Sequence, residues 1–181
     1  HDRFAFNDNQ KYAYKNMNFS ANWRSIFSEK LTANFSFGYD HYDYRNDESV
    51  EEAAAARLSF AINQWFGKVD FSYKLDNNHT LNFGLMSQFY NINSGTYEPL
   101  HESSLVKWDQ LQKDKALESA IYIGDQWEIT PKLSVNAGIR YSMFNLLGPR
   151  TYYTYQDGML PSSTTVVDSV SVGGGKVVKT Y

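Results

Sequence analysis

The chain has 181 residues, of which 17% are aromatic and 20% charged, with a net charge of −3 and no cysteine. The lack of cysteine excludes disulfides, thiolate nucleophiles and cysteine-bound zinc within this chain, and the slight acidic excess argues against a nucleic-acid partner. No apolar run approaches the roughly 18 residues of a membrane-spanning helix, whereas membrane strands are compatible with this composition because their signal is alternation.

A period of two dominates the sequence from Met17 onward. Apolar residues occupy odd positions in 17–27, with Asn, Ser and Arg between them, and the pattern resumes over 31–39 after Ser28-Glu29-Lys30. A helix would place its apolar residues three and four positions apart. These segments therefore predict two antiparallel strands joined by a tight turn.

The same arrangement recurs twice further along the chain. Alternating segments flank the turn at 76–79, and again the turn at Thr130-Pro131-Lys132. The strands predicted around these turns are 68–75, 81–85, 121–127 and 133–143.

Longer polar stretches separate the three hairpins. They cover residues 43–52, 91–117 and 146–181. Strands of about ten residues, joined alternately by short turns and long loops, are typical of outer-membrane barrels, whereas strands of soluble proteins are usually about five or six residues long. The sequence therefore predicts an all-β fold: an antiparallel transmembrane β-barrel segment with short periplasmic turns and long extracellular loops.

Aromatic residues recur at two depths relative to the short turns. Those three to six residues before a turn, and those about ten residues after one, are Trp23, Tyr73 and Trp127, and Tyr39, Phe89 and Tyr141. Trp and Tyr favour membrane interfaces, where their rings are apolar and their polar atoms reach headgroups or water. We expect two aromatic levels separated by roughly one apolar band.

The polar positions between the apolar ones predict that the second face of these strands is hydrated and lines the lumen of a barrel. We expect Arg24, Asp70, Lys74, Asn136 and Arg140 to face that lumen. About six strands are too few to enclose a polar interior, because even eight leave room only for side chains. Further strands must therefore come from elsewhere.

Several segments resemble TonB-dependent outer-membrane transporters. In residues 120–127 a strand ends in Asp-Gln-Trp, and Ile129-Thr130-Pro131-Lys132-Leu133 then leads into the Gly-x-Arg-Tyr strand at 136–141. Residues 23–44 and 68–92 resemble the large members of the family, which carry a carboxypeptidase-regulatory-like N-terminal domain.

The resemblance implies a 22-stranded barrel, of which residues 1–181 supply about six long strands as part of one barrel domain. The plug domain and the remaining strands lie outside this chain. The family takes up its substrates across the Gram-negative outer membrane with TonB-coupled energy. The implied partners are outer-membrane lipid, the rest of the barrel and its plug, the inner-membrane TonB energy complex acting through the plug, and a surface lipoprotein.

Aromatic residues in the expected extracellular loops are the candidate substrate-binding residues. They are Trp108, Tyr152, Tyr153 and Tyr155. Exposed rings can stack on sugars or grip peptides, and loop aromatics can equally pack against one another. The transported substrate is left open between siderophore, glycan and peptide.

No catalytic or metal site is expected, and no cofactor. Of the four histidines, His1, His41, His79 and His101, none has a second ligand at metal spacing. The acidic cluster at 47–52 lacks the ligand pattern of an EF-hand. Asp70 and Asp125 are the best candidates for paired carboxylates, and no nucleophile elbow is present.

Two other functions are compatible with these patterns. A passive outer-membrane pore or adhesin barrel would have the same strands without a plug. A soluble all-β carbohydrate-binding module would instead use the aromatic face as a platform for sugars.

Overall fold

The computed structural model describes residues 2–7, 10–49 and 51–181. Six long strands form its main sheet: β2 (Gln10–Ile26), β3 (Leu31–Glu48), β4 (Ala56–Lys74), β5 (His79–Pro99), β7 (Asp114–Thr130) and β8 (Leu133–Leu147). The shorter elements are β1 (Asp2–Asn7), the 3₁₀ turn η1 (Glu52–Ala54), β6 (Asp109–Gln110), β9 (Arg150–Tyr155), β10 (Val166–Val172) and β11 (Val177–Thr180). Within the described ranges, no helix has the length and hydrophobicity needed to cross a membrane.

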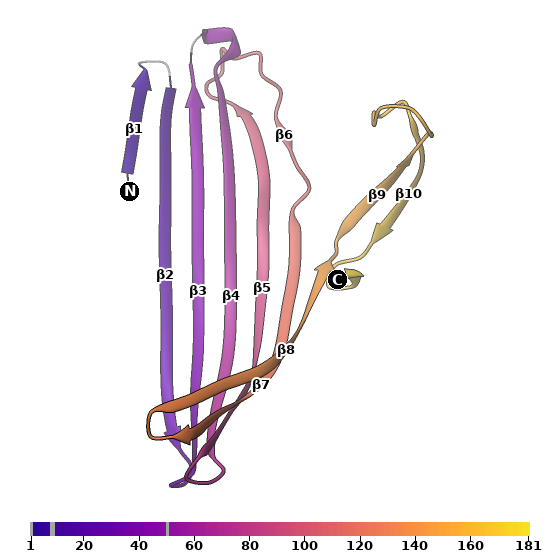
Figure 1. The fold of residues 1–181 in the computed structure, drawn as a ribbon. Helices are drawn as coiled ribbons and strands as arrows, with labels where there is room; N and C mark the ends of the chain where they lie inside the picture. Colours follow the sequence, from indigo (N-terminus) through magenta and orange to yellow (C-terminus); the bar gives the residue numbers. More distant parts are fainter. Residues whose placement is uncertain (1, 8–9, 50) are drawn as a thin grey trace.

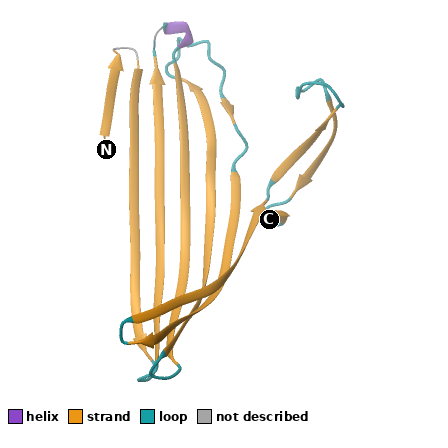
Figure 2. Ribbon diagram, in the orientation of Figure 1, coloured by secondary structure: helices purple, strands orange, loops and turns teal. Residues whose placement is uncertain are grey.

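The strands follow one another as an antiparallel meander. Their order is β1-β2-β3-β4-β5-β7-β8-β11, with β6 beside β5, and β9 and β10 form a separate hairpin. The three short turns lie together at one end, while η1, the longer connections and the β9–β10 hairpin lie toward the other (Figure 1; Figure 2). This confirms the expected antiparallel barrel segment with about six long strands, short turns and long loops.

The long strands extend further than the sequence predicts. They contain 15 to 21 residues, and β4 begins at Ala56, well before the alternating segment at 68–75. The connections shrink accordingly to residues 49–55 and 100–113. Alternation lapses in the added parts, whereas the ladder of backbone hydrogen bonds that holds a strand does not depend on side-chain polarity.

One register relation connects the five main strand pairings. Between the irregularity of β4 at Ser59 and Ala61 and the one at Thr130, which pairs with Leu133 beside the last short turn, odd-numbered residues pair with odd ones. One row across all six strands contains Trp23, Phe35, Val69, Leu85, Ile121 and Tyr141. Paired residues point to the same side of a sheet, so the odd face is apolar and the even face is polar, as the alternation predicts.

On the four central long strands, the apolar face ends at a row of polar residues toward the long loops. These residues are His41, Asn63, Asn91 and Lys115, and the ends of the row on β2 and β8 are Met17 and Leu147. Asn63 Oδ1 accepts a hydrogen bond from the Tyr39 hydroxyl and lies 2.8 Å from His41 Nδ1. Tyr39 therefore has its ring on the apolar side of this boundary and its hydroxyl on the polar side, as interfacial aromatics do.

On β2 and β3, the two expected aromatic levels are closer together than predicted. Trp23 pairs with Phe35, and Tyr39 lies four residues further along β3. At about 3.3 Å per residue this separation is about 13 Å along the strand, roughly half of an apolar band about 25 Å tall. The expectation of a full band between these levels is wrong for β2 and β3.

The sheet has no core of large side chains. Among the described residues, the buried hydrophobic ones are all alanines, and no large side chain is fully buried. Large apolar residues of the odd face are exposed, including Phe19, Trp23 and Ile139. A soluble domain buries such residues between two layers, and this single layer leaves its apolar face to be covered from outside.

Both edges of the sheet are largely unpaired. Strand β1 pairs only with residues 10–14 of β2, and β11 only with residues 145–147 of β8. One further backbone pair joins Phe144 and Tyr181. In the described part of the chain, residues 15–26 and 133–143 thus present one side of their backbone without a neighbouring strand.

Candidate functional site

The charged residues predicted to line the lumen lie on one polar face. Arg24, Asp70, Lys74, Asn136 and Arg140 all occupy even positions of the sheet. One row crosses the six long strands through Arg24, Asn34, Asp70, Gly84, Tyr122 and Arg140. The register therefore gathers three of the five predicted residues into one row.

Tyr122 connects the centre of this row. Its hydroxyl donates a hydrogen bond to Asp70 across the intervening position of Gly84. A Cβ atom at Gly84 would lie 2.4 Å from the Tyr122 hydroxyl oxygen and 2.3 Å from the Val69 carbonyl oxygen. Glycine is thus required here for a close approach, and its missing side chain opens the path from Tyr122 to Asp70.

Two cations flank the Tyr122 ring. Lys68 Nζ lies 2.9 Å from Asp70 Oδ1 and 5.7 Å from the ring centroid. The Arg140 guanidinium lies 5.9 Å from the same centroid. Lys68 contacts the Asp70 carboxylate directly, whereas Arg24 and Arg140 lie two and three strands away from Asp70 in the same row. The row can hold an anionic group, such as a carboxylate of a substrate or of another protein segment.

Lys74 and Asn136 lie in a different row, nearer the short turns. Strand pairing places them with Thr80 and Gln126. Four residues separate Lys74 from Asp70, and four separate Asn136 from Arg140, so each offset is about 13 Å along its strand. The structure thus divides the predicted set into a charged row and a second, weakly charged row.

Aromatic residues cover the polar face closer to the long loops. Tyr44 lies between Tyr12 and Phe60, with ring centroids 6.4 and 6.0 Å away, and the Phe144 ring lies 6.4 Å from Tyr90. Burial, followed by the neighbouring Tyr12, raises the pKa of the Tyr44 phenol above its ordinary value. Sequence reasoning missed this aromatic wall, although these residues share the even parity of the polar face.

The four predicted substrate-binding aromatics do not share one surface. Trp108 is exposed in the connection between β5 and β7. Tyr152, Tyr153 and Tyr155 lie on β9, where successive side chains point to opposite sides. The Arg150 guanidinium lies 5.3 Å from the Tyr152 ring, and Tyr153 contacts Tyr155 on the other side. Their role in binding substrate stays a prediction.

An ion pair anchors the β9–β10 hairpin to the sheet. Arg150 binds Asp114 at the start of β7, and Gln112 Nε2 donates a hydrogen bond to the Pro149 carbonyl. The position of Tyr152 follows from this anchor, because Arg150 precedes it by two residues on the same face of β9.

The two candidate carboxylates lie on opposite faces. Asp70 is on the even face, and Asp125 is on the odd face near the short turns, where its Oδ2 lies 2.6 Å from His79 Nδ1. Asp70 and Asp125 therefore do not form a pair. His79 is held by Asp125 and stacks on Trp127.

The acidic loop is engaged in ordinary contacts. Arg57 donates two hydrogen bonds to Asp47, of 2.6 and 2.9 Å, and Ser103 donates one to Glu52. Over the described residues, no group of three potential metal ligands is present. His1 lies outside the described residues.

An open antiparallel sheet with one apolar and one polar face, and no core between layers, defines a segment of an outer-membrane β-barrel wall. Residues 2–173 match the family described as TonB dependent receptor-like, beta-barrel. The chain belongs to this family, which is a transporter and receptor family rather than an enzyme family. No curated protein and no solved structure matches the chain.

Family membership indicates how the two faces of the sheet are oriented. A transmembrane barrel turns its apolar residues to lipid and its polar residues to the interior. The odd face has the apolar character of a lipid-facing surface, and the placement of the row from Arg24 to Arg140 on the interior surface stays a prediction.

Proposed function

We propose that this chain forms part of the wall of an active transporter that takes up its substrate across the Gram-negative outer membrane with TonB-coupled energy. The observation that carries the proposal is the charged row from Arg24 to Arg140 on the interior surface. In it Asp70 binds Tyr122 and the neighbouring Lys68, and Arg140 lies beside the Tyr122 ring. A fixed, charged wall provides a docking surface for a plug inside the barrel.

The remaining strands of the barrel pair with the two open edges. Unpaired backbone groups are not tolerated in hydrocarbon, so residues 15–26 and 133–143 require neighbours. Strand β1 has the register of a strand that would continue along residues 15–26, and β11 has that of a strand that would continue along β8. We infer that residues 1–181 belong to one barrel domain, whose plug and other strands are supplied by segments outside these residues.

Substrate binds at the long-loop end in this proposal. Tyr12, Tyr44 and Phe60 form an aromatic surface there on the interior side, and Trp108, Tyr152, Tyr153 and Tyr155 lie in the adjoining loops. Aromatic rings offer flat apolar surfaces to sugars and to apolar side chains of peptides. A surface lipoprotein that covers this end is a further partner in the proposal.

Conductance and TonB binding test the proposal on the intact protein. In a planar bilayer, a barrel closed by a plug shows no steady conductance, and a pull-down with the periplasmic domain of TonB retains the protein. A permanently open channel that does not bind TonB would identify a passive pore or adhesin barrel instead.

The charged row has its own test in the same bilayers. Replacing Asp70 with Asn, and Arg140 with Gln, removes the charges that hold the plug in this proposal, and we expect leak conductance to appear. The matched control is Asn136→Gln in the second row, for which no leak is expected. Closed bilayers with all three variants would contradict a plug contact at this row.

A further inference from the structure

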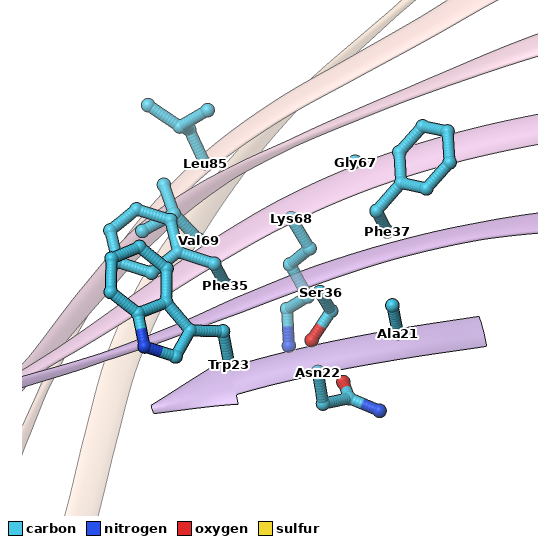
Figure 3. A pocket seen from close by; sticks show the side chains of 10 residues that line it. All are labelled: Ala21, Asn22, Trp23, Phe35, Ser36, Phe37, Gly67, Lys68, Val69 and Leu85. Atoms are coloured by element: carbon cyan, nitrogen blue, oxygen red, sulfur yellow. The ribbon is translucent and has the colours of Figure 1, made fainter. Parts of the chain in front are cut away.

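The lipid-facing surface contains a groove where one row of the sheet carries small side chains. Ala21, Gly67 and Ser87 lie in this row together with Phe37. Nothing lies within 4 Å of the position that a Cβ atom would take at Gly67. The resulting hollow has a volume of about 450 Å³ and is shown in Figure 3.

Packed aromatic rings wall this groove on both sides. Toward the short turns, Trp23 stacks on Phe35 with a centroid distance of 5.2 Å and an interplanar angle of 24°. Toward the long loops, Trp65 contacts Phe37 and Tyr39 at 5.7 and 4.3 Å. Each aromatic side chain that walls the groove packs against another aromatic ring, so the walls have fixed positions.

The groove continues across the neighbouring strands. A second hollow of about 310 Å³ shares Leu85 with the first and extends over Ser87, Ser119 and Met143. Ser119 pairs with Ser87 and thus continues the row of small residues. The lining residues of both hollows follow two neighbouring rows of the sheet, so the combined groove runs across the strands and has its β2 end at Ala21. The groove is continuous with the lipid interface, which identifies its occupant as hydrocarbon.

The groove lies in the outer half of the membrane. Its row is one row below Tyr39 and Trp65, and two rows below the polar boundary at His41 and Asn63. Four residues span about 13 Å along a strand, and a strand tilt of about 40° reduces this depth to about 10 Å. The hydrocarbon core is about 30 Å thick, so a chain entering from the outer surface reaches this depth.

Two cations stand above the groove on the same face. Lys15 is six residues from Ala21 along β2, and Arg45 is on β3; both side chains are exposed. Asp43 pairs with Lys15, and its carboxylate lies 3.1 Å from His41 Nε2. Six residues correspond to about 20 Å along the strand, or about 15 Å in depth, so Lys15 stands about 5 Å outside the polar boundary, at the depth of a lipid phosphate. Arg45 pairs with Ala13, one row further out, and its long side chain can extend back toward the same depth.

We propose that this groove binds an anionic lipid of the outer leaflet, with an acyl chain along Gly67 and its phosphate at Lys15 and Arg45. The site rests on the membrane placement of the sheet and is independent of substrate transport. The groove supplies fixed hydrocarbon contacts, and the two cations supply charge complementarity to the phosphate.

Fluorescence quenching of Trp23 tests the site in the intact protein. The protein is placed in phosphatidylcholine vesicles that contain increasing fractions of phosphatidylglycerol brominated in the middle of its acyl chains. The signal of Trp23 is the difference between the wild type and Trp23→Phe. We expect quenching of this signal to saturate at a lower lipid fraction with brominated phosphatidylglycerol than with brominated phosphatidylcholine.

Three variants separate the parts of the site. Gly67→Leu fills the groove, and we expect loss of the saturating quenching with both lipids. The double variant Lys15→Gln and Arg45→Gln keeps the groove, and we expect loss of the preference for phosphatidylglycerol alone. The control Ala137→Leu enlarges a lipid-facing residue outside this groove, and its quenching should match the wild type.

Two results would overturn the proposal. Equal quenching of Gly67→Leu and the wild type would show that the groove holds no lipid chain. If Gly67→Leu instead dissociates an oligomer, measured by light scattering, while quenching is unchanged, a second copy of the protein covers this face.

Discussion

Gly84 and Gly67 lie on the adjacent strands β5 and β4, on opposite faces of the sheet, and differ in their tolerance for a side chain. A Cβ atom at Gly84 would lie 2.3 Å from the Val69 carbonyl oxygen, whereas the same atom at Gly67 meets nothing within 4 Å. We expect Gly84→Ala to lower the free energy of unfolding by about 1–3 kcal/mol, as overpacking does, and Gly67→Ala to change it by less than about 0.5 kcal/mol. Reversible urea unfolding of the intact protein in lipid measures both, and a larger loss for Gly67→Ala would contradict the register.

Charge tolerance also differs between the two faces. Leu85 is in the third of the five apolar rows that run from Leu31 to Tyr39, and Gln88 is on the interior face of the same strand. We expect Leu85→Arg to cost about 2–4 kcal/mol near mid-membrane and Gln88→Arg to cost less than about 1 kcal/mol. The same folding assay measures both values, and equal costs would refute the assignment of the faces.

Ala137 probes the same assignment on β8. It lies on the apolar face, four residues from Leu133 at the start of its strand, which is about 13 Å along the strand and about 10 Å in depth at a tilt of about 40°. We expect Ala137→Arg to cost about 2–4 kcal/mol at this depth and Asn136→Arg to cost less than about 1 kcal/mol. Alternation predicts the face of a residue, whereas its depth depends on the register with neighbouring strands.

The sequence predicts which residues share a face and leaves their partners undetermined. Tyr122 and Asp70 are 52 positions apart, and their contact follows from two strand pairings and the missing side chain of Gly84. The contact between His79 and Asp125 arises in the same way. No local pattern encodes such pairs, because each depends on the sum of several registers.

At the scale of the element, the turn between β4 and β5 contains a titratable group. The Asp76 carboxylate accepts hydrogen bonds of 2.8 Å from the backbone N–H groups of Asn78 and His79. The first of these, and then the second, hold the pKa of Asp76 below its ordinary value of 3.8. The ionised form is therefore favoured in the folded turn.

This turn should contribute a pH-dependent stability. Because the pKa of Asp76 is lowered on folding, the contribution is complete above 3.8 and is lost as the pH falls below that value. Asp76→Ala should remove this dependence, so that wild type and variant converge in acid. Unfolding midpoints measured across pH 2.5–6 check this, with Asn77→Ala as the control; a difference that grows in acid would have the wrong sign.

Strand existence was predictable, and strand length was not. The segments 17–27, 31–39 and 133–143 alternate because each has one face in lipid and one in water. Residues 56–62 of β4 lie beyond the polar row at Asn63, where water and loops meet both faces and selection for alternation lapses. The aromatic wall around Tyr44 lies in the same region and was missed for the same reason.

At the scale of the whole molecule, the sheet depends on surroundings that water does not supply. Large apolar side chains such as Trp23 and Ile139 are exposed on a single layer. We expect the isolated 181-residue chain to aggregate in buffer without detergent and to show no cooperative thermal transition. Analytical ultracentrifugation and circular dichroism check this, and a monomer that melts cooperatively would favour a soluble module.

The shared parity of the strand pairings has a consequence for how this chain can change in evolution. Inserting or deleting a single residue inside a long strand would turn every later side chain of that strand over, so that Asn and Arg would meet lipid and Phe would meet water. Changes of two residues avoid this inversion, and lengthening at 49–55 or 100–113 avoids it altogether. Among natural variants, we therefore expect length differences to accumulate in these connections. Where a length difference occurs inside a long strand, we expect it to be an even number of residues.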